Sequence, residues 1–421
     1  MQIKVIRRDT CRLCNSFHLE LVVPLAPTPV AEKYVTPEES GVPTPKYPLD
    51  LYQCRTCGHV QMRDVVDPAF LFADYTYRSG ITKRIIDHFD EIAASTMGRF
   101  NIRKDGLAVD IGSNDGSLLG RFKHRGMCVL GVDPATEIAK VAMAAGVPTI
   151  TDFMSLALAQ RIRLEHGPAS VVCAFNVFAH NDDLAGMAES IRTLLAPDGV
   201  FVFEASYLLD IVDRMLLGTI FHEHVSHHSV KPLVSFLRQH GLELIDVQRN
   251  SIQGGSIVGT VQPLGGPHAV SSTVHDLLKL ENDRQLDQPA TLIEFGANLQ
   301  RLKKQLGTLL EELHNQGKSI WGYGAARSGT TLIAQMDLGE VITRIVDDSP
   351  EKQNRLSPGD HIPVLPTRAL YEQMPAYTLI LAWIHAQPII RNNREYLERG
   401  GRFIVCVPEI QVIGPEFFSK K

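Results

Sequence analysis

Residues 107–119 read LAVDIGSNDGSLL, an apolar run that ends in a glycine-containing loop and continues into a helical pattern. A strand, loop and helix in this order open a βαβ unit. Further apolar runs follow between residues 127 and 205, separated from one another by helical patterns: MCVLGVD, PTITD, SVVCAFNVFAH and GVFVFEA. Apolar strands that alternate with helices predict an α/β fold with a doubly wound parallel sheet.

The last two strands of this sheet are expected to differ from the rest. Residues 242–250, LELIDVQRN, and residues 256–264, SIVGTVQPL, are strand-like and lie close together in the sequence. The short connection predicts an antiparallel hairpin. A hairpin that closes a parallel sheet is typical of a class I methyltransferase domain, so we expect a Rossmann-like domain of this type in the middle of the chain.

A second, smaller α/β domain is expected in the last third of the chain. Residues 266–290 are polar and rich in turn formers, which indicates a boundary. A long helix with one apolar seam should follow, formed by Leu292, Phe295, Leu299, Leu302, Leu306, Leu309 and Leu313. Because the seam covers only about three heptads, it favours packing within the chain over a dimeric coiled coil. Four strand-like runs come next, at residues 319–329, 342–348, 377–383 and 402–408.

The composition is that of an ordinary globular protein. The chain has 421 residues, 44% of them hydrophobic and 21% charged, and its net charge is 42 − 47 = −5. Without a basic run, binding to nucleic acid or to an anionic membrane surface is not expected. No apolar stretch reaches the ~20 residues that span a bilayer, and the start of the chain lacks the apolar core of a signal peptide. We therefore expect a cytoplasmic protein, as a monomer or weak dimer.

Four of the seven cysteines form two CxxC pairs, Cys11 with Cys14 and Cys54 with Cys57. Cysteines with this spacing sit on a tight turn and face one ion, and two such turns complete the tetrahedral sulfur shell that zinc prefers. The pattern predicts a structural zinc site, and four reduced cysteines without metal are the alternative. The other three lie in apolar runs and are expected to be small core residues: Cys128, Cys173 and Cys406.

A nucleotide-like cofactor is expected at the carboxyl ends of the strands of the middle domain. The loop after the first strand lacks the GxGxxG spacing of a pyrophosphate site, while the second strand ends at Asp133, whose carboxylate can accept hydrogen bonds from ribose hydroxyls. This combination favours S-adenosylmethionine over NAD. The residues expected to bind the cofactor are Gly112, Asn114, Asp115, Gly116, Asp133, Pro134, Asp152, Phe153 and Asn176.

Two segments offer a histidine as a general base. The sequence FHEHVS at residues 221–226 places Glu223 next to His224, and a histidine held by a carboxylate is a good base near neutral pH. A structural hydrogen-bonding role and a metal site remain alternatives for this segment. His180, at the end of the fourth strand, is the rival candidate for the base.

A second glycine loop, GYGAARSG, occupies residues 322–329 before a helix. N–H groups at the start of a helix can bind a phosphate, and Arg327 would be its counter-ion. Substrate contacts are expected from Ala326, Arg327 and Ser328. Together with Asp347 and Asp348, the loop could also form a dinucleotide site, so an NAD-dependent oxidoreductase is an alternative function. A methyltransferase-like binding protein without catalysis is the third alternative.

The motifs, taken in order, resemble those of the sugar C-methyltransferases of deoxysugar pathways, which methylate a ring carbon next to the ketone of a nucleotide-linked 4-keto sugar. The resemblance covers almost the whole chain. It rests on CxxC…CxxCG (11–58), YxYxS (75–79), IGSNDGSLL (111–119), NVFAH (176–180), HEH (222–224), GGS (254–256) and DDSPEKQNRLSPGDHIPV (347–364).

The resemblance implies three domains: a zinc-binding domain at residues 1–70, an S-adenosylmethionine-binding domain at 71–265, and a C-terminal Rossmann-like domain at 266–421 that contributes to nucleotide-sugar binding. It also implies that His224 is the base, with Glu223 and Tyr75 around the sugar. Further substrate contacts are expected from Tyr77, Ser79, His222, Gly254, Gly255 and Ser256.

We therefore predict an S-adenosylmethionine-dependent C-methyltransferase of deoxysugar and antibiotic biosynthesis. His224 would remove the proton next to the ketone, and Tyr75 would stabilise the enolate oxygen. The chain differs from the family pattern at Phe221, where Tyr is usual, at Gln253, where His is usual, and at Ile384, where Asn is usual. These positions are expected substrate contacts, so the differences concern the sugar more than the methyl transfer.

Overall fold

The strand that carries the first glycine loop is β8 (Leu107–Ile111), an interior strand of a seven-stranded sheet. The structure is a computed structural model that describes residues 4–72 and 78–418. The sheet has the order β10-β9-β8-β11-β12-β15-β14. Its other strands are β9 (Cys128–Val132), β10 (Thr149–Ile150), β11 (Ala169–Phe175), β12 (Leu195–Ser206), β14 (Leu242–Asn250) and β15 (Ser256–Pro263). β14 and β15 form the predicted antiparallel hairpin, so the predicted class I methyltransferase fold is confirmed.

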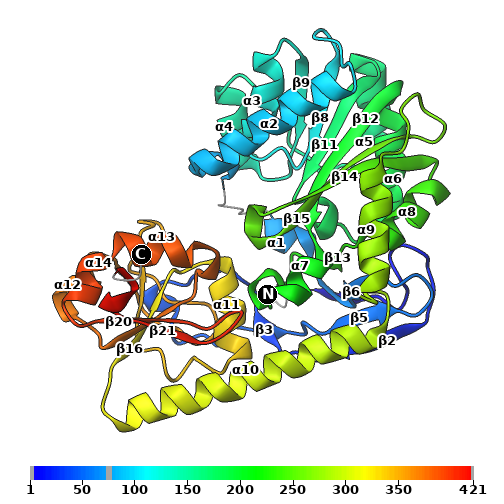
Figure 1. Ribbon diagram of the computed structural model, residues 1–421. Helices are drawn as coiled ribbons and strands as arrows, with labels where there is room; N and C mark the ends of the chain where they lie inside the picture. Colours follow the sequence, from blue (N-terminus) through cyan, green and yellow to red (C-terminus); the bar gives the residue numbers. More distant parts are fainter. Residues whose placement is uncertain (1–3, 73–77, 419–421) are drawn as a thin grey trace. The chain divides into compact units, whose positions relative to one another are not determined.

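Helices cover both faces of this sheet (Figure 1). One face carries α2 (Lys83–Arg99), α3 (Ser117–His124) and α4 (Thr136–Ala144), and the other carries α5 (Leu156–His166), α6 (Leu184–Leu194) and α8 (Val230–Gln239). The core under the first three helices packs Phe89 and Phe122 against Val171, Cys173 and Val202 of the sheet. Because both faces are covered, the strands read as continuous apolar runs in the sequence.

The N-terminal part adds smaller sheets. β13 (Ser226–His227), β6 (Val60–Met62), β5 (Leu51–Cys54) and β2 (Leu19–Val23) form a four-stranded sheet in that order. β1 (Val5–Arg7) pairs with β7 (Asp64–Val66), and β3 (Thr28–Pro29) pairs with β4 (Lys46–Tyr47). The short helix α1 (Pro68–Phe72) follows β7.

The C-terminal part contains a second sheet with the order β18-β17-β16-β19-β20-β21. Its strands are β16 (Ile320–Tyr323), β17 (Ile345–Asp347), β18 (Val364–Pro366), β19 (Tyr377–Ile380), β20 (Arg402–Val405) and β21 (Gln411–Ile413). Its helices are α11 (Arg327–Gln335), α12 (Arg368–Gln373), α13 (Ala386–Asn392) and α14 (Arg394–Glu398). The four predicted strands are present and parallel, whereas β18 and β21 were not predicted.

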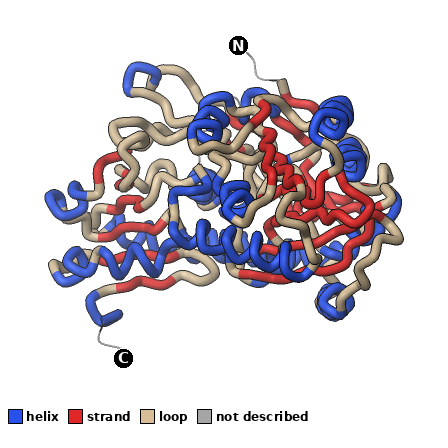
Figure 2. Tube along the Cα trace, turned by 90° about the horizontal axis from the view of Figure 1, so that it is seen from above, coloured by secondary structure: helices blue, strands red, loops and turns tan. Residues whose placement is uncertain are grey.

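The contacts divide the chain into two units, each made of three separate segments. Helices and strands occur throughout the described residues (Figure 2). The first unit comprises Met1–Glu20, Tyr52–Leu209 and Val225–Gln288. The second comprises Leu21–Leu51, Asp210–His224 and Pro289–Lys421. The first unit therefore contains the seven-stranded sheet, and the second contains the six-stranded sheet.

The connecting helices are α9 (Ser272–Asp283) and the long helix α10 (Pro289–Asn315). The apolar seam of α10 is buried within this chain, as expected, with one correction: Leu310 is buried where the sequence had suggested Leu309. The two leucines are adjacent, and a step of four residues from Leu306 fits the helical repeat as well as a step of three.

The expected burial of the three remaining cysteines needs a second correction. Cys173 and Cys406 are buried, but Cys128 is exposed: it is the first residue of β9 and pairs with Leu107 at the end of the sheet. Within residues 4–72 and 78–418, helices long and apolar enough to cross a membrane are absent.

Candidate functional site

The four cysteines of the two CxxC pairs lie together. Their sulfur atoms are all within 4.8 Å of one another. The Sγ atoms of Cys11 and Cys57 are 3.6 Å apart, and those of Cys14 and Cys54 are 3.5 Å apart. Four thiol groups gathered from two turns match the tetrahedral sulfur shell of a structural zinc site.

Both cysteine turns have the same backbone construction. The N–H of Asn15 donates to the carbonyl oxygen of Cys11 at 3.0 Å, and the N–H of Gly58 donates to that of Cys54 at 2.9 Å. Asn15 and Gly58 have φ angles of +57° and +82°, in the left-handed region that Asn and Gly adopt most readily. A Cβ atom at Gly58 would lie 2.8 Å from the Cβ of Asp287, so the glycine is also required for space.

The loop between β8 and α3 has a left-handed backbone conformation at three residues. Gly112 and Gly116 have φ angles of +71° and +76°, and Asn114 has a φ of +49°. A Cβ atom at Gly112 would lie 2.3 Å from Cγ2 of Val177, so only glycine fits there. The loop stands at the carboxyl end of β8, on the edge of the sheet where folds of this class bind nucleotides.

Asp133 holds this loop from the end of β9. One carboxylate oxygen accepts the N–H of Asn114 at 2.8 Å, and the other accepts the N–H of Ala135 at 2.9 Å. Burial raises the pKa of Asp133, while these two hydrogen bonds lower it. Each carboxylate oxygen can accept more than one hydrogen bond, so the arrangement is compatible with additional bonds from a ribose.

The segment that precedes α2 lies against the same loop. The N–H of Ser79 donates to Oδ1 of Asn114 at 2.9 Å, and the N–H of Gly80 donates to Oδ2 of Asp115 at 2.8 Å. A Cβ atom at Gly80 would lie 2.8 Å from that same oxygen of Asp115. The structure thus brings Ser79 next to two predicted cofactor residues. The other two candidates of the YxYxS motif, Tyr75 and Tyr77, lie outside the described residues.

Asp110, in β8, lies within the motif of residues 107–119 but is not among the predicted site residues. It is buried, and its Oδ1 has no hydrogen-bond partner among the described residues. Burial, together with the charge of Asp133, raises the pKa of Asp110 to about 8. The group is therefore mainly protonated at neutral pH in the free protein. Its position inside an apolar strand was the signal that could have identified it.

Two of the residues expected to bind the cofactor, Asp152 and Phe153, are exposed. Asp152 and Phe153 follow β10, and the Oδ1 of Asp152 accepts the N–H of Phe153 at 2.8 Å. The side chain of Phe153 is 45% exposed, which is unusual for a phenylalanine. Pro134 is half-buried beside Asp133. An exposed aromatic ring at this edge of the sheet is available to stack on a base.

Asn176 and His180 lie in the loop after β11. Asn176 has a φ of +56°, and its N–H donates to the carbonyl oxygen of Glu204 at 2.8 Å. His180 ends a short 3-10 helix, and its ring stacks on that of Phe72 at a centroid distance of 5.7 Å. Both residues therefore stand at the same edge of the sheet as the glycine loop.

Glu204, in β12, is a further candidate that the sequence did not reveal. It is fully buried, and its Oε1 lies 3.0 Å from Nε2 of His88 and 2.8 Å from Nδ2 of Asn250. Its Oε2 has no partner among the described residues. The partners are 116 and 46 residues away in the sequence, so no local pattern could have indicated this cluster.

His224 belongs to the second unit and is held in a defined tautomer. Its Nδ1 lies 2.7 Å from the carbonyl oxygen of Thr219, and since a carbonyl only accepts, Nδ1 carries the proton and Nε2 is the basic nitrogen. Burial lowers the pKa of His224 to about 4; the Thr219 carbonyl opposes this effect, and the charge of Arg327 adds to it. The ring is therefore neutral at neutral pH.

Glu223, next to this histidine, forms a partly buried ion pair. Its Oε2 accepts from Nη1 of Arg327 at 2.9 Å, and the guanidinium of Arg327 also lies over the ring of Phe221, 5.9 Å from its centroid. His222 points elsewhere: its Nε2 contacts the carbonyl oxygen of Tyr47 at 3.3 Å. The structure thus brings together two predicted site residues, Glu223 and Arg327, that are 104 positions apart.

The second glycine loop is built like the first. Oδ2 of Asp347, at the end of β17, accepts the N–H of Ala325 at 2.6 Å, as Asp133 accepts a loop N–H in the other sheet. Gly324 has a φ of +95°, and a Cβ atom there would lie 2.4 Å from that of Ala382. Ala326 is the residue before α11, and Ser328 donates to the carbonyl oxygen of Leu381 at 3.3 Å.

The GGS segment forms the tight turn between β14 and β15. Gly254 and Gly255 have φ angles of +90° and +154°, and Gln253 has a φ of +51°. The hydroxyl of Ser256 donates to the carbonyl oxygen of Ile252 at 3.0 Å. These bonds shape the turn, which ends next to the carboxyl edge of β12.

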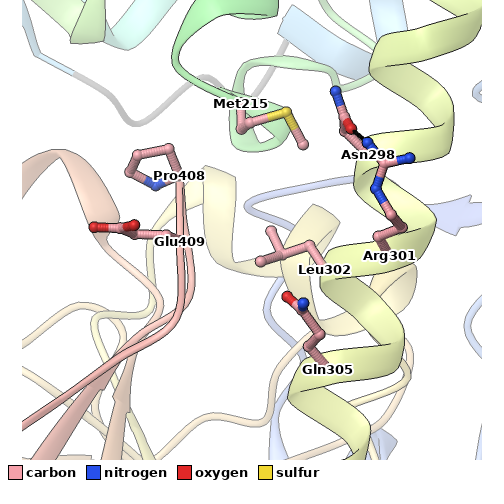
Figure 3. A pocket seen from close by; sticks show the side chains of 7 residues that line it. All are labelled: Met215, Asn298, Arg301, Leu302, Gln305, Pro408 and Glu409. Atoms are coloured by element: carbon pink, nitrogen blue, oxygen red, sulfur yellow. Dashed lines mark hydrogen bonds between the residues drawn. The ribbon is translucent and has the colours of Figure 1, made fainter.

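A cavity of about 240 Å³ lies in the second unit, away from these residues (Figure 3). Met215 and the side chains of α10 face residues 408–409 across it. It is lined by Met215, Asn298, Arg301, Leu302, Gln305, Pro408 and Glu409. The predicted site residues do not line this cavity.

The predicted residues thus form three groups. The cysteines form one group and the cofactor candidates, with Ser79 and His180, form another, both in the first unit. Glu223, His224 and residues 326–328 form the third group, in the second unit. His222 and the turn of residues 254–256 are not joined to these groups by the contacts described above.

Three family models match successive parts of the chain. Residues 11–72 match the family described as "Putative zinc binding domain", residues 77–247 match the family described as "Methyltransferase domain", and residues 251–408 match the family described as "C-methyltransferase C-terminal domain".

Similar proteins were found among curated sequences and solved structures. C-methyltransferase NovU from Streptomyces niveus is 35% identical over 409 residues, which cover 97% of each chain. Magnesium protoporphyrin IX methyltransferase from Synechocystis PCC 6803 with bound SAH is 17% identical over 42% of this chain and 82% of that chain, with a TM-score of 0.34. A S-adenosylmethionine-dependent methyltransferase from Clostridium acetobutylicum is 12% identical over 43% of this chain and 92% of that chain, with a TM-score of 0.36.

Proposed function

Because this chain belongs to a family of C-methyltransferases, we propose that it methylates a ring carbon next to the ketone of a nucleotide-linked 4-keto deoxysugar. The predicted enzyme class, an S-adenosylmethionine-dependent C-methyltransferase, is confirmed by the family. The substrate and the roles of individual residues are our proposal. The observation that carries it is the neutral His224, whose tautomer is fixed by the carbonyl of Thr219.

A base is needed because a carbon next to a ketone must lose a proton before it can attack a methyl group. Nε2 of His224 would take that proton, and the electron pair of the C–H bond would move toward the ketone oxygen. Tyr75 would donate a hydrogen bond to this oxygen. Glu223 would stabilise the protonated histidine, and Arg327 would hold Glu223 in place through their 2.9 Å ion pair.

The cofactor would bind at the carboxyl edge of the seven-stranded sheet. S-adenosylmethionine supplies an electrophilic methyl group when it is bound. Asp133 would hold both the glycine loop and the ribose, and Phe153 would stack on the base. Asn176 would complete the site at the end of β11. The protein would contribute mainly alignment and exclusion of water.

The division of function along the chain is part of the proposal. Residues 1–70 would hold a structural zinc ion through Cys11, Cys14, Cys54 and Cys57, which the gathered sulfur atoms support. Residues 71–265 would bind S-adenosylmethionine. Residues 266–421 would contribute to the binding of the nucleotide sugar through the loop of residues 322–329.

A panel of nucleotide-linked 4-keto sugars tests the substrate class. Each would be incubated in deuterated water with and without S-adenosylmethionine, and proton NMR would follow exchange of the proton next to the ketone and the appearance of a C-methyl signal. We expect at least one member to exchange and to be methylated. Binding of S-adenosylmethionine without exchange or methylation of any member would contradict the proposed substrate.

The same assay tests the base. His224→Ala should bind the cofactor and the sugar nearly as the wild type does and should lose both exchange and methylation. His180→Ala is the matched comparison. If His180→Ala lost exchange while His224→Ala retained it, the role of base would pass to His180.

A further inference from the structure

Arg12 lies between Cys11 and Cys14 in the first cysteine turn, and its side chain contacts residues that are distant in the sequence. Its side chain has an exposed fraction of 0%. Nη1 donates to the carbonyl oxygens of Met62 at 2.6 Å and Val225 at 3.0 Å, and Nε donates to Oδ1 of Asp182 at 2.9 Å. A buried guanidinium with these fixed partners is a rigid link between the segments that supply them.

Asp182 belongs to the loop of residues 176–183, which also carries Asn176 and His180. A second arginine close to the cysteine turn contacts the same residue: Nη1 of Arg8 donates to the carbonyl oxygen of Asp182 at 3.1 Å and to its Oδ2 at 3.3 Å. Both carboxylate oxygens of Asp182 are therefore bound by arginines from the N-terminal segment.

The cysteine turn is itself fixed in place by β6. The N–H of Arg12 donates to Oε1 of Gln61 at 2.8 Å, and Nε2 of Gln61 donates to the carbonyl oxygen of Thr10 at 3.0 Å. Gln61 is fully buried and pairs with Ser226 in β13. The turn and the arginine it carries are thus one rigid piece.

Charge explains why an arginine occupies this position. Four thiolates around one divalent zinc ion leave a net formal charge of about −2. Buried charges need partners of opposite sign. Asp182 supplies a carboxylate at 2.9 Å from Nε of Arg12, and the guanidinium is carried by the turn that holds Cys11 and Cys14.

We propose that Arg12 is a positioning residue that couples the metal site to the loop of residues 176–183. Through Asp182, the cysteine turn sets the place of Asn176 and His180 at the edge of the cofactor site. The inference rests on the proposed cofactor role of Asn176. Within the loop itself, the N–H of His180 donates to the carbonyl oxygen of Val177, a bond that shapes the turn without fixing the loop to the metal-binding region.

Two substitutions break the link from either side. Asp182→Asn removes the charge from a side chain that is 35% exposed, so folding should be retained. Arg12→Gln removes the guanidinium. Arg7→Gln is the control, because Arg7 lies in the same N-terminal segment and forms a 3.2 Å ion pair with Asp64, outside this loop. For each protein we would measure the zinc content, the amide exchange of residues 176–183 and the Kd for S-adenosylmethionine by calorimetry.

We expect Asp182→Asn and Arg12→Gln to keep their zinc, because all four cysteines remain. Exchange in residues 176–183 should become at least about 10-fold faster, and the Kd should rise about 10-fold, as for the loss of a charged hydrogen bond. The double variant should bind S-adenosylmethionine no more weakly than the single variant with the higher Kd, because both substitutions break the same link. Chelation of zinc from the wild type should also speed exchange in this loop. Arg7→Gln should match the wild type.

Unchanged loop exchange and an unchanged Kd in zinc-loaded Asp182→Asn would overturn the inference, whether or not Arg12→Gln folds. Uniformly faster exchange over the whole first unit would also overturn it, because that result indicates general destabilisation. Loop exchange requires neither cofactor nor sugar. If the wild type failed to methylate any keto sugar, the proposed function would be wrong. Amide exchange in residues 176–183 would still test whether the metal site is coupled to this loop.

Discussion

At the scale of single residues, the two large sheets share one feature, an aspartate that accepts a hydrogen bond from the glycine loop. Asp133 and Asp347 each end the second strand of a sheet and accept an N–H from the glycine loop of the first strand. The sequence predicts the position of Asp133 and its role toward a ribose. It does not predict that the carboxylate also holds the loop, because the partner is a backbone amide that leaves no trace in the residue pattern.

The first prediction follows for Asp133→Ala. The variant should bind S-adenosylmethionine about 10- to 100-fold more weakly, since it loses hydrogen bonds to a charged group worth about 1.5–3 kcal/mol. Calorimetry would measure the Kd. Asp105→Ala is the control, because Asp105 is a surface residue whose side chain is 71% exposed. Equal affinities in the two variants would remove Asp133 from the cofactor site.

The second prediction concerns the pH dependence set by His224. Because burial lowers its pKa to about 4, below its ordinary value of 6.5, the ring stays neutral as the pH falls through 6.5. The profile of kcat/KM should therefore have no acid limb near pH 6.5, and activity limited by this base should fall only toward pH 4. Arg327→Gln should shift the limb upward, because the charge of Arg327 helps to lower this pKa. An acid limb at pH 6.5 in the wild type would argue against His224 as the base.

The candidate site was only partly predictable from its residues. The cysteines and the glycine loop follow local spacing rules, and the structure gathers the cysteines as expected. The ion pair between Glu223 and Arg327 and the bond between Arg12 and Asp182 join residues 104 and 170 positions apart. Contacts of this kind depend on tertiary packing, which one sequence does not encode as a pattern.

At the scale of elements, most of the long strands and helices were predicted, but α9 was not, because its segment has a polar composition that indicated only a boundary. Among the short strands, β10 and β17 were predicted, and β18 and β21 were missed. β8, β11 and the hairpin of β14 and β15 have apolar runs long enough to recognise. β18 and β21 have three residues each, too few for a periodic signal. The contacts of α2 were also not predicted. This helix contains His88, which contacts the buried Glu204, and Arg99, which forms an ion pair with Asp246.

The third prediction concerns the interaction of Glu204 with His88 of α2. Burial disfavours the charged form of His88, but the hydrogen bond to Glu204 and the charge of Glu204 outweigh this effect and raise the pKa of His88. The pair therefore stabilises the fold fully below the unfolded pKa of about 6.5, and this stabilisation is lost as the pH rises through the higher folded value. His88→Gln should lower the free energy of unfolding by about 1.5–3 kcal/mol at pH 6, and by less at pH 9.

Denaturant unfolding at several pH values would measure this effect. His166→Gln serves as the control, because His166 is on helix α5, on the other face of the sheet, and its side chain is 43% exposed. A destabilisation of His88→Gln that grows with pH would contradict the sign of the argument, since it would mean that the neutral histidine is the stabilising form.

At the scale of the whole molecule, the two cysteine pairs lie on either side of a long excursion of the chain. The first pair lies before residue 20, where the chain leaves the first unit, and the second lies after residue 52, where it returns. The intervening Leu21–Leu51 segment belongs to the second unit, where Gln335 binds the backbone of Ala26 through both its amide atoms. This explains why the spacing between the pairs exceeds that of a compact zinc ribbon.

The fourth prediction follows from this arrangement. A zinc ion that joins Cys11 and Cys14 to Cys54 and Cys57 closes the loop formed by the Leu21–Leu51 segment, and closing a loop of this length restricts the unfolded chain. Cys54→Ser should therefore lose metal, lower the Tm and speed amide exchange in residues 21–51 as well as in the cysteine turns. Elemental analysis, thermal unfolding and mass spectrometry would measure these effects. Cys128→Ser is the matched control, because Cys128 is exposed and lies outside the cysteine cluster. One zinc ion per chain in Cys54→Ser, with exchange in residues 21–51 unchanged, would show that the cysteines do not close this loop.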